Sequence, residues 1–149
     1  LPQLKWMLSE ETSLLSIIIV FVWKMLGYNI MIILAALQSV PREVYEAAKM
    51  DRAGQVKTFF HVTIPMISPT LVFLITNNVT SSFCSFDIID LMTKGGPKNS
   101  SNMMVYWIYE NAFSYYRVGP AMAGAVVLLM LVGSISVLVF TISNRKAHY

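Results

Sequence analysis

The apolar residues of this chain are gathered into long stretches rather than spread evenly along it. Residues 14–37 and 119–142 each form an almost unbroken apolar run. A helix over either run is long enough to cross about 30 Å of hydrocarbon. Residues 66–86 are apolar in their first half and polar in their second, so their polar groups must face protein or water rather than lipid. The pattern predicts an all-α membrane protein, a polytopic helical bundle with three transmembrane helices.

The charged residues at the ends of these stretches predict how the chain is oriented. Basic residues gather in the connection 38–65 and at the C-terminal end, whereas the connection 87–118 mixes both signs. Because cytoplasmic loops are rich in Lys and Arg, we expect 38–65 to be cytoplasmic and 87–118 external. Residues 94–97 (KGGP) indicate a turn in the external connection. Apolar positions at helical spacing in 102–116 predict a short helix, lying either in the outer interface or against the spans.

Composition supports a membrane protein and gives no sign of catalysis. Hydrophobic residues make up 56% of the 149 and charged residues 13%, whereas soluble domains carry about 25% charged residues. The net charge of +3 is not gathered into one basic run, so we expect no nucleic-acid partner. The lone Cys84 and the distant His61 and His148 lack metal-ligand spacing. We therefore expect no catalytic residue, metal or cofactor. The first residues contain no signal peptide pattern and resemble an inter-helix loop, which favours a fragment of a longer polytopic protein.

The connection 38–65 has more internal structure than a simple turn needs. Pro41 suits the start of a helix, and Glu43 and Glu46 lie in its first turns, where negative charge complements the helix dipole. Gly54 is expected to break this helix. Its small apolar face comprises Val44, Ala47 and Ala48. A rigid helix with such a face suits a groove on another protein, and the alternative is a helix that lies on the bilayer.

The same connection carries a family resemblance. Glu46-Ala47-Ala48, followed by Val62-x-Ile64-Pro65, resembles the EAA motif of ABC-importer permeases. Residues 37–41 (LQSVP), Tyr45 and Asp51-x-Ala53 also match, and residues 92–100 (MTKGGPKNS), Tyr106-x-x-Tyr109 and Ala112-Phe113 resemble the carbohydrate branch of that family. That branch includes the maltose, glycerol-3-phosphate and multiple-sugar permeases. The resemblance covers nearly the whole chain and implies that it is the C-terminal half of such a permease.

The resemblance implies a function and a set of partners. The chain is expected to form part of the path for a carbohydrate or related polar solute in a bacterial or archaeal cell membrane. It would work by alternating access with ATP-binding ABC subunits, a second permease subunit and an extracytoplasmic solute-binding protein, surrounded by lipid. ATP hydrolysis would belong to the separate subunits, so the chain itself is expected not to be an enzyme. The residues expected to couple to the ATPase are Glu46, Ala47, Ala48, Asp51, Gly54 and Pro65.

One position departs from the family pattern. The motif has a glycine six residues after its glutamate, and this chain has Arg52 there. If the turn requires a positive φ, a residue other than glycine costs on the order of 1 kcal/mol. Two interpretations remain open at this point: Gly54 takes over the turn, or the loop tolerates the change with weaker coupling.

Polar residues in the second predicted span mark a candidate solute face. Asn78, Ser81, Ser82 and Ser85 fall at i, i+3, i+4 and i+7, on one side of a helix. Their amides and hydroxyls suit the hydroxyls of a sugar, and the alternative is hydrogen bonding between helices. In the first span, Tyr28 is a candidate for stacking on a sugar. Lys24, one turn earlier, either reaches outward to the interface or lines the cavity.

Other functions fit parts of this pattern. A permease of the same architecture for phosphate, peptides or amino acids would share the three spans, although the Gly95-Gly96-Pro97 loop argues against it. A small membrane adaptor without a conducting role, or a truncated remnant, would also be apolar.

Overall fold

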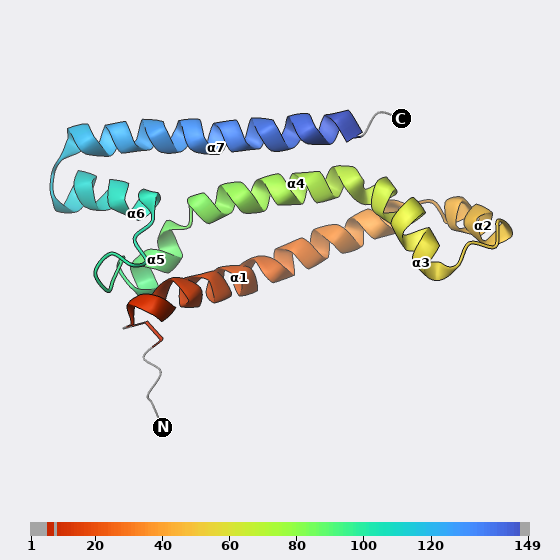
Figure 1. The fold of residues 1–149 in the computed structure, drawn as a ribbon, viewed down its shortest axis with the longest axis horizontal. Coiled ribbons are helices and arrows are strands. Elements are labelled where there is room, and N and C mark those ends of the chain that lie inside the picture. The colour runs from red at the N-terminus through yellow and green to blue at the C-terminus, as the bar shows by residue number, and fades with distance from the viewer. Residues whose placement is uncertain (1–5, 8, 147–149) are drawn as a thin grey trace, which may run out of the picture.

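The computed structural model describes residues 6–7 and 9–146, with side chains up to Thr141. This part of the chain is helical throughout its regular structure and contains no strand. Three long helices lie side by side in one layer and alternate in direction (Figure 1). They are α1 (Glu10–Ser39), α4 (Ile64–Phe83) and α7 (Val118–Lys146). Three helical segments are long and apolar enough to cross a membrane, which confirms the all-α membrane fold.

Helix α4 lies between the other two long helices and packs against both. The short helices gather at the two ends of this layer. At one end, the α2 end, are α2 (Arg42–Met50) and α3 (Gln55–Thr58). At the other, the α6 end, are α5 (Phe86–Met92), α6 (Met104–Tyr109) and the π-helical segment η2 (Glu110–Ser114) (Figure 1).

Proline sets the boundary between α1 and α2. The residue before a proline is disfavoured in the helical region, and Val40, which precedes Pro41, is extended with ψ 123°. The first helix therefore ends at Ser39. Because a proline needs no N–H donor at a helix start, Pro41 serves as the N-cap of α2.

The return to the membrane begins earlier than the apolar run alone indicates. Helix α3, the π-helical segment η1 (Phe59–Thr63) and α4 follow one another without a break. Residues 55–65, which we expected to belong to the connection, are therefore helical. Pro65 lies in the first turn of α4. A proline ring clashes with the carbonyl four residues earlier, and the wider π turn immediately before Pro65 accommodates that mismatch.

The C-terminal end of α4 differs from the predicted span 66–86. The helix ends at Phe83, and Ser85 precedes α5 as its N-cap with ψ 68°. Near this end, the Ser82 hydroxyl donates to the carbonyl of Val79 at 2.7 Å. Serine side chains that bond to nearby backbone groups compete with helix formation. The prediction was thus wrong in extending this span through Ser85 and Phe86.

A small core forms at the α6 end, where α1, α5 and α6 meet. It contains Ile17, Ile88, Ile89 and Tyr106. Burial raises the pKa of the Tyr106 hydroxyl. The turn after α5 is tied to α1 by an ion pair between Lys98 and Glu10 at 2.6 Å and by a hydrogen bond between the Ser13 and Ser100 hydroxyls at 2.8 Å. Elsewhere the long helices expose large apolar side chains, which suits contact with lipid or further helices.

Candidate functional site

Helix α2 lies beyond the ends of α1 and α4, at the α2 end of the layer (Figure 1). One side of it faces the protein: Ala48 is buried, and the hydroxyl of Thr63 in η1 donates to the Tyr45 hydroxyl at 3.4 Å. The opposite side faces outward, since Glu46 and Ala47 are exposed. The expected small apolar face is therefore divided, because Ala48 points inward and Ala47 points outward.

The C-terminal end of α2 forms a Schellman cap. The Ala53 N–H donates to the Ala48 carbonyl and the Arg52 N–H to the Lys49 carbonyl, each at 3.0 Å, which is the paired bonding of that motif. The motif places one residue in the left-handed region, usually a glycine. Here that residue is Arg52, with φ 54°. Gly54 has φ −67° and instead begins α3 as its N-cap. The interpretation that Gly54 takes over the turn is therefore wrong.

The candidate coupling residues separate into an exposed and a packed group. Glu46, Ala47, Asp51 and Gly54 are exposed. Met50, which the sequence reasoning did not single out, lies among them with 86% of its surface exposed. Ala48 is buried and Pro65 is half-buried in α4. The exposed group thus lies on α2, at its C-cap and at the N-cap of α3, whereas Ala48 lies on the buried side of α2.

On the candidate solute face, Asn78 of α4 is paired with Asn29 of α1. The two amides exchange hydrogen bonds: Asn29 Nδ2 donates to Asn78 Oδ1 at 3.2 Å, and Asn78 Nδ2 donates to Asn29 Oδ1 at 2.9 Å. Both side chains line a pocket of about 300 Å³ between the two helices. Its other walls are apolar and comprise Phe21, Val22, Met25, Leu26, Ile30 and Ile33. Sequence reasoning did not predict this pair, because it depends on how α1 and α4 are aligned.

The serines of this face lie in two different settings. Ser81 and Ser82 are half-buried on α4, whereas Ser85 is buried beyond the end of that helix. The helical face predicted from the spacing therefore holds from Asn78 to Ser82 only. Tyr28, the candidate stacking residue, is exposed on α1, one residue before the asparagine that pairs with Asn78.

Lys24 is engaged in an ion pair. Its ammonium donates to a carboxylate oxygen of Asp87 in α5. Side chains on a helix point toward its N-terminus, so Lys24 extends from α1 toward the α6 end. The hydrogen bond from Lys24 lowers the pKa of the Asp87 carboxyl. This contact joins α1 to α5, and its acidic partner was not predicted from the sequence.

Comparison with known proteins decides the family. The model of the family described as "binding-protein-dependent transport system inner membrane component" matches residues 3–149. The chain belongs to that family. Its membership agrees with the EAA-like segment in α2 and with the three apolar helical segments. The family description names an inner membrane component, which agrees with the membrane location that the three apolar helical segments support.

Curated relatives are 35–40% identical to the chain over the regions that align. The sn-glycerol-3-phosphate transport system permease protein UgpA of Pectobacterium atrosepticum is 40% identical over 134 residues, which cover 89% of this chain and 45% of that protein. UgpA of Escherichia coli O157:H7 is 35% identical over 147 residues, covering 97% of this chain and 50% of that protein. The chain thus spans about half the length of these relatives. No solved structure matches it.

Proposed function

We propose that this chain is the C-terminal half of a permease subunit in an ABC importer. It would form part of the transmembrane path for a carbohydrate or related polar solute and would couple to separate ATP-binding subunits by alternating access. The observation that carries this proposal is the arrangement of α2. It is a short capped helix that presents Glu46 and Met50 to the surroundings while Tyr45 and Ala48 attach it to the membrane helices.

The orientation follows from the charges. With the α2 end in the cytoplasm, the basic residues Arg42, Lys49, Arg52 and Lys57 lie on the side that the positive-inside rule requires. The α6 end then faces the extracytoplasmic side, where a solute-binding protein would dock. A second permease subunit would cover apolar faces that the long helices of this chain leave exposed.

The solute path would follow the polar side of α4. Asn78, Ser81 and Ser82 lie within that helix and Ser85 just beyond it, and each is at least half-buried. Polar groups at this depth are costly unless they meet a partner or a water-filled path. The Asn29–Asn78 pair satisfies one of them within the protein, while Tyr28 remains exposed for a solute or a neighbouring helix.

The solute of the relatives is named as sn-glycerol 3-phosphate, and a phosphorylated polyol is accordingly a second candidate. A phosphate group requires a positively charged or N–H-rich partner. Lys24, the lysine inside the first span, is already paired with Asp87. Because Lys24 is paired in this way, its positive charge is not free for a phosphate group. The pairing therefore favours a neutral polyhydroxylated solute at this level of the path.

The test is co-purification of the full-length gene product with its ATPase and companion permease subunits. A Glu46→Lys variant reverses the charge at the exposed side of α2. A Glu11→Lys variant makes the same change on the exposed first turn of α1, at the opposite end of the molecule. We expect the ATPase to co-purify with the wild type and with Glu11→Lys but not with Glu46→Lys. Equal recovery in all three would refute the assignment of α2 as the coupling helix.

A further inference from the structure

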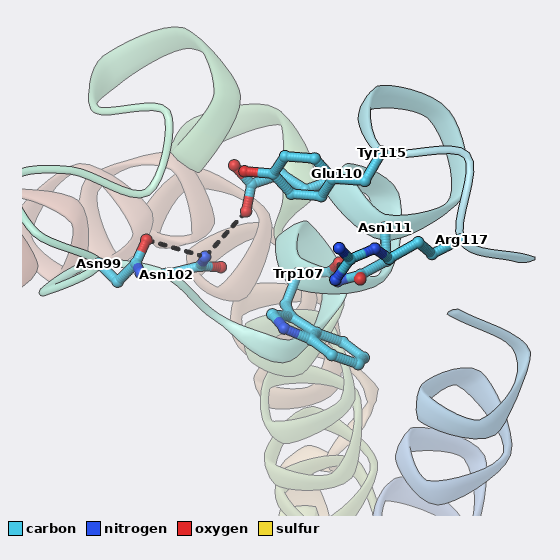
Figure 2. Close-up of a pocket in the computed structure, with 7 residues that line it drawn as sticks. All are labelled: Asn99, Asn102, Trp107, Glu110, Asn111, Tyr115 and Arg117. Atoms are coloured by element: carbon cyan, nitrogen blue, oxygen red, sulfur yellow. Dashed lines mark hydrogen bonds between the residues drawn. The ribbon is translucent and has the colours of Figure 1, made fainter. Parts of the chain in front are cut away.

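A polar pocket lies at the α6 end, apart from the candidate solute face. It is about 260 Å³ in volume and is formed by the turn after α5, by α6 and η2, and by the segment that leads into α7. Figure 2 shows its side chains arranged around a common space. The lining residues are Asn99, Asn102, Trp107, Glu110, Asn111, Tyr115 and Arg117.

The lining combines aromatic surfaces with groups that donate and accept hydrogen bonds. Trp107 and Tyr115 offer ring faces, on which the C–H groups of a sugar or polyol can pack. Three asparagine amides, a carboxylate and a guanidinium supply donors and acceptors at several angles, as vicinal hydroxyl groups require. Within the described residues, neither Glu110 nor Arg117 takes part in an ion pair. Both charges therefore remain available to a ligand.

The hydrogen bonds already present leave one buried acceptor without a donor. Asn102 Nδ2 donates to Glu110 Oε2 at 3.0 Å and to Asn99 Oδ1 at 3.5 Å. These two acceptors fix the orientation of the Asn102 amide. Its oxygen is buried and, among the described residues, has no hydrogen-bond partner, and it points toward the side of the pocket where Trp107 and Arg117 lie (Figure 2). This oxygen has less than 1 Å² of exposed surface, so it forms part of the pocket wall and does not itself contact a ligand.

Packing holds the pocket in shape before any ligand arrives. The Trp107 ring lies so close to Gly124 of α7 that a Cβ there would stand 2.7 Å from Cζ3. Asn111 is buried, and its amide donates to the Trp107 carbonyl at 2.9 Å. The backbone N–H of Arg117 donates to the backbone carbonyl of Asn111 at 2.7 Å. This bond holds the segment that carries Arg117 beside η2. A binding site fixed in this way loses little entropy on binding.

We propose that this pocket is a binding site for a small polyhydroxylated solute, about the size of a single sugar unit. The proposal rests on the proposed function, because the orientation given above places the α6 end outside the membrane. The volume lies just below the usual range of small-ligand pockets, about 300–1,000 Å³, so a ligand larger than one unit would extend out of it. The site would hold solute at the surface, ahead of the path along α4.

The experiment measures solute binding to the full-length permease, purified with its companion subunit and without any binding protein. The probes are glycerol, sn-glycerol 3-phosphate and maltose, each titrated by calorimetry and by tryptophan fluorescence. Tyr115→Ala removes one ring from the pocket, whereas Tyr116→Ala removes the neighbouring exposed ring that does not line it. We expect at least one probe to bind saturably, about tenfold more weakly to Tyr115→Ala than to wild type, and equally well to Tyr116→Ala.

Two further variants test whether the solute binds at this pocket or along the polar side of α4. Trp107→Phe should abolish the fluorescence change and weaken binding by calorimetry, and Asn78→Ala should leave binding at the pocket intact. The proposal is overturned if no probe binds the wild type, if Asn78→Ala alone removes all binding, or if Tyr115→Ala binds every probe as tightly as the wild type does. Co-purification of the ATPase, scored on the same preparations, reports separately on the proposed function.

Discussion

Arg52 occupies a backbone position that glycine would fill at lower cost, and replacing it should stabilise the cap of α2. Its φ is 54°, and the left-handed conformation costs a residue with a Cβ roughly 1–2 kcal/mol. Glycine avoids that cost but loses about 0.5–1 kcal/mol through the greater freedom of the unfolded chain. The net gain for Arg52→Gly is therefore about 1 kcal/mol, or about fivefold in the local opening equilibrium.

Hydrogen exchange of the purified full-length permease measures that opening directly. The Arg52 and Ala53 amides donate the two bonds of the cap, so their exchange should slow about fivefold in Arg52→Gly. Arg52→Ala is the matched control, because it removes the same side chain but keeps the Cβ. Gly54→Ala tests the neighbouring glycine, which has φ −67° and open space where a Cβ would be added; exchange of the cap amides should not accelerate in this variant.

Two results would refute this reasoning. If Arg52→Ala slows exchange as much as Arg52→Gly does, the effect comes from the side chain and not from φ. If Gly54→Ala accelerates exchange at the cap, Gly54 rather than Arg52 holds the turn. If the expected pattern is found, ATPase co-purification with Arg52→Gly would then show whether a more stable cap also strengthens coupling.

Two more variants test packing between the helices. In Gly124→Ala the new Cβ would lie 2.7 Å from the Trp107 ring, so we expect a loss of about 1–3 kcal/mol and a lower melting temperature; Gly133→Ala, with nothing within 4 Å, should not lower it. Asn29→Leu leaves the Asn78 amide without its partner and should destabilise the protein by about 1 kcal/mol. A double change of both asparagines to leucine should cost less than the sum of the single changes, and strict additivity in thermal unfolding would contradict the pairing.

Much of the fold could be predicted from the sequence because length and apolarity suffice to define a membrane span. The boundaries could not be predicted as well. Hydropathy does not show that the Ser82 hydroxyl donates to the Val79 carbonyl near the end of α4, and the break before Ser85 was therefore not predicted. Pro41 was read correctly, since its effect on φ and on the preceding residue is local.

The parts of the candidate sites that escaped prediction all depend on contacts between distant segments. The partner of Asn78 lies 49 residues away, and the partner of Lys24 lies 63 residues away. Spacing along one helix shows which side chains share a face but not which neighbour they meet. At Arg52, the family pattern indicated a turn, but only the backbone angles showed that the arginine itself adopts the left-handed conformation.

The unbroken helix from Gln55 to Phe83 has a mechanical consequence. It bends at η1, where α3 turns away from the line of α4 (Figure 1). The straight part is α4, whose 20 residues make a rod about 30 Å long, and Thr63, directly before α4, attaches this end to α2. A rod that pivots near its middle moves its two ends in opposite directions. Under the proposed function, drawing α2 inward on the cytoplasmic side would therefore swing the Ser82 end outward, so that one side of the membrane opens as the other closes.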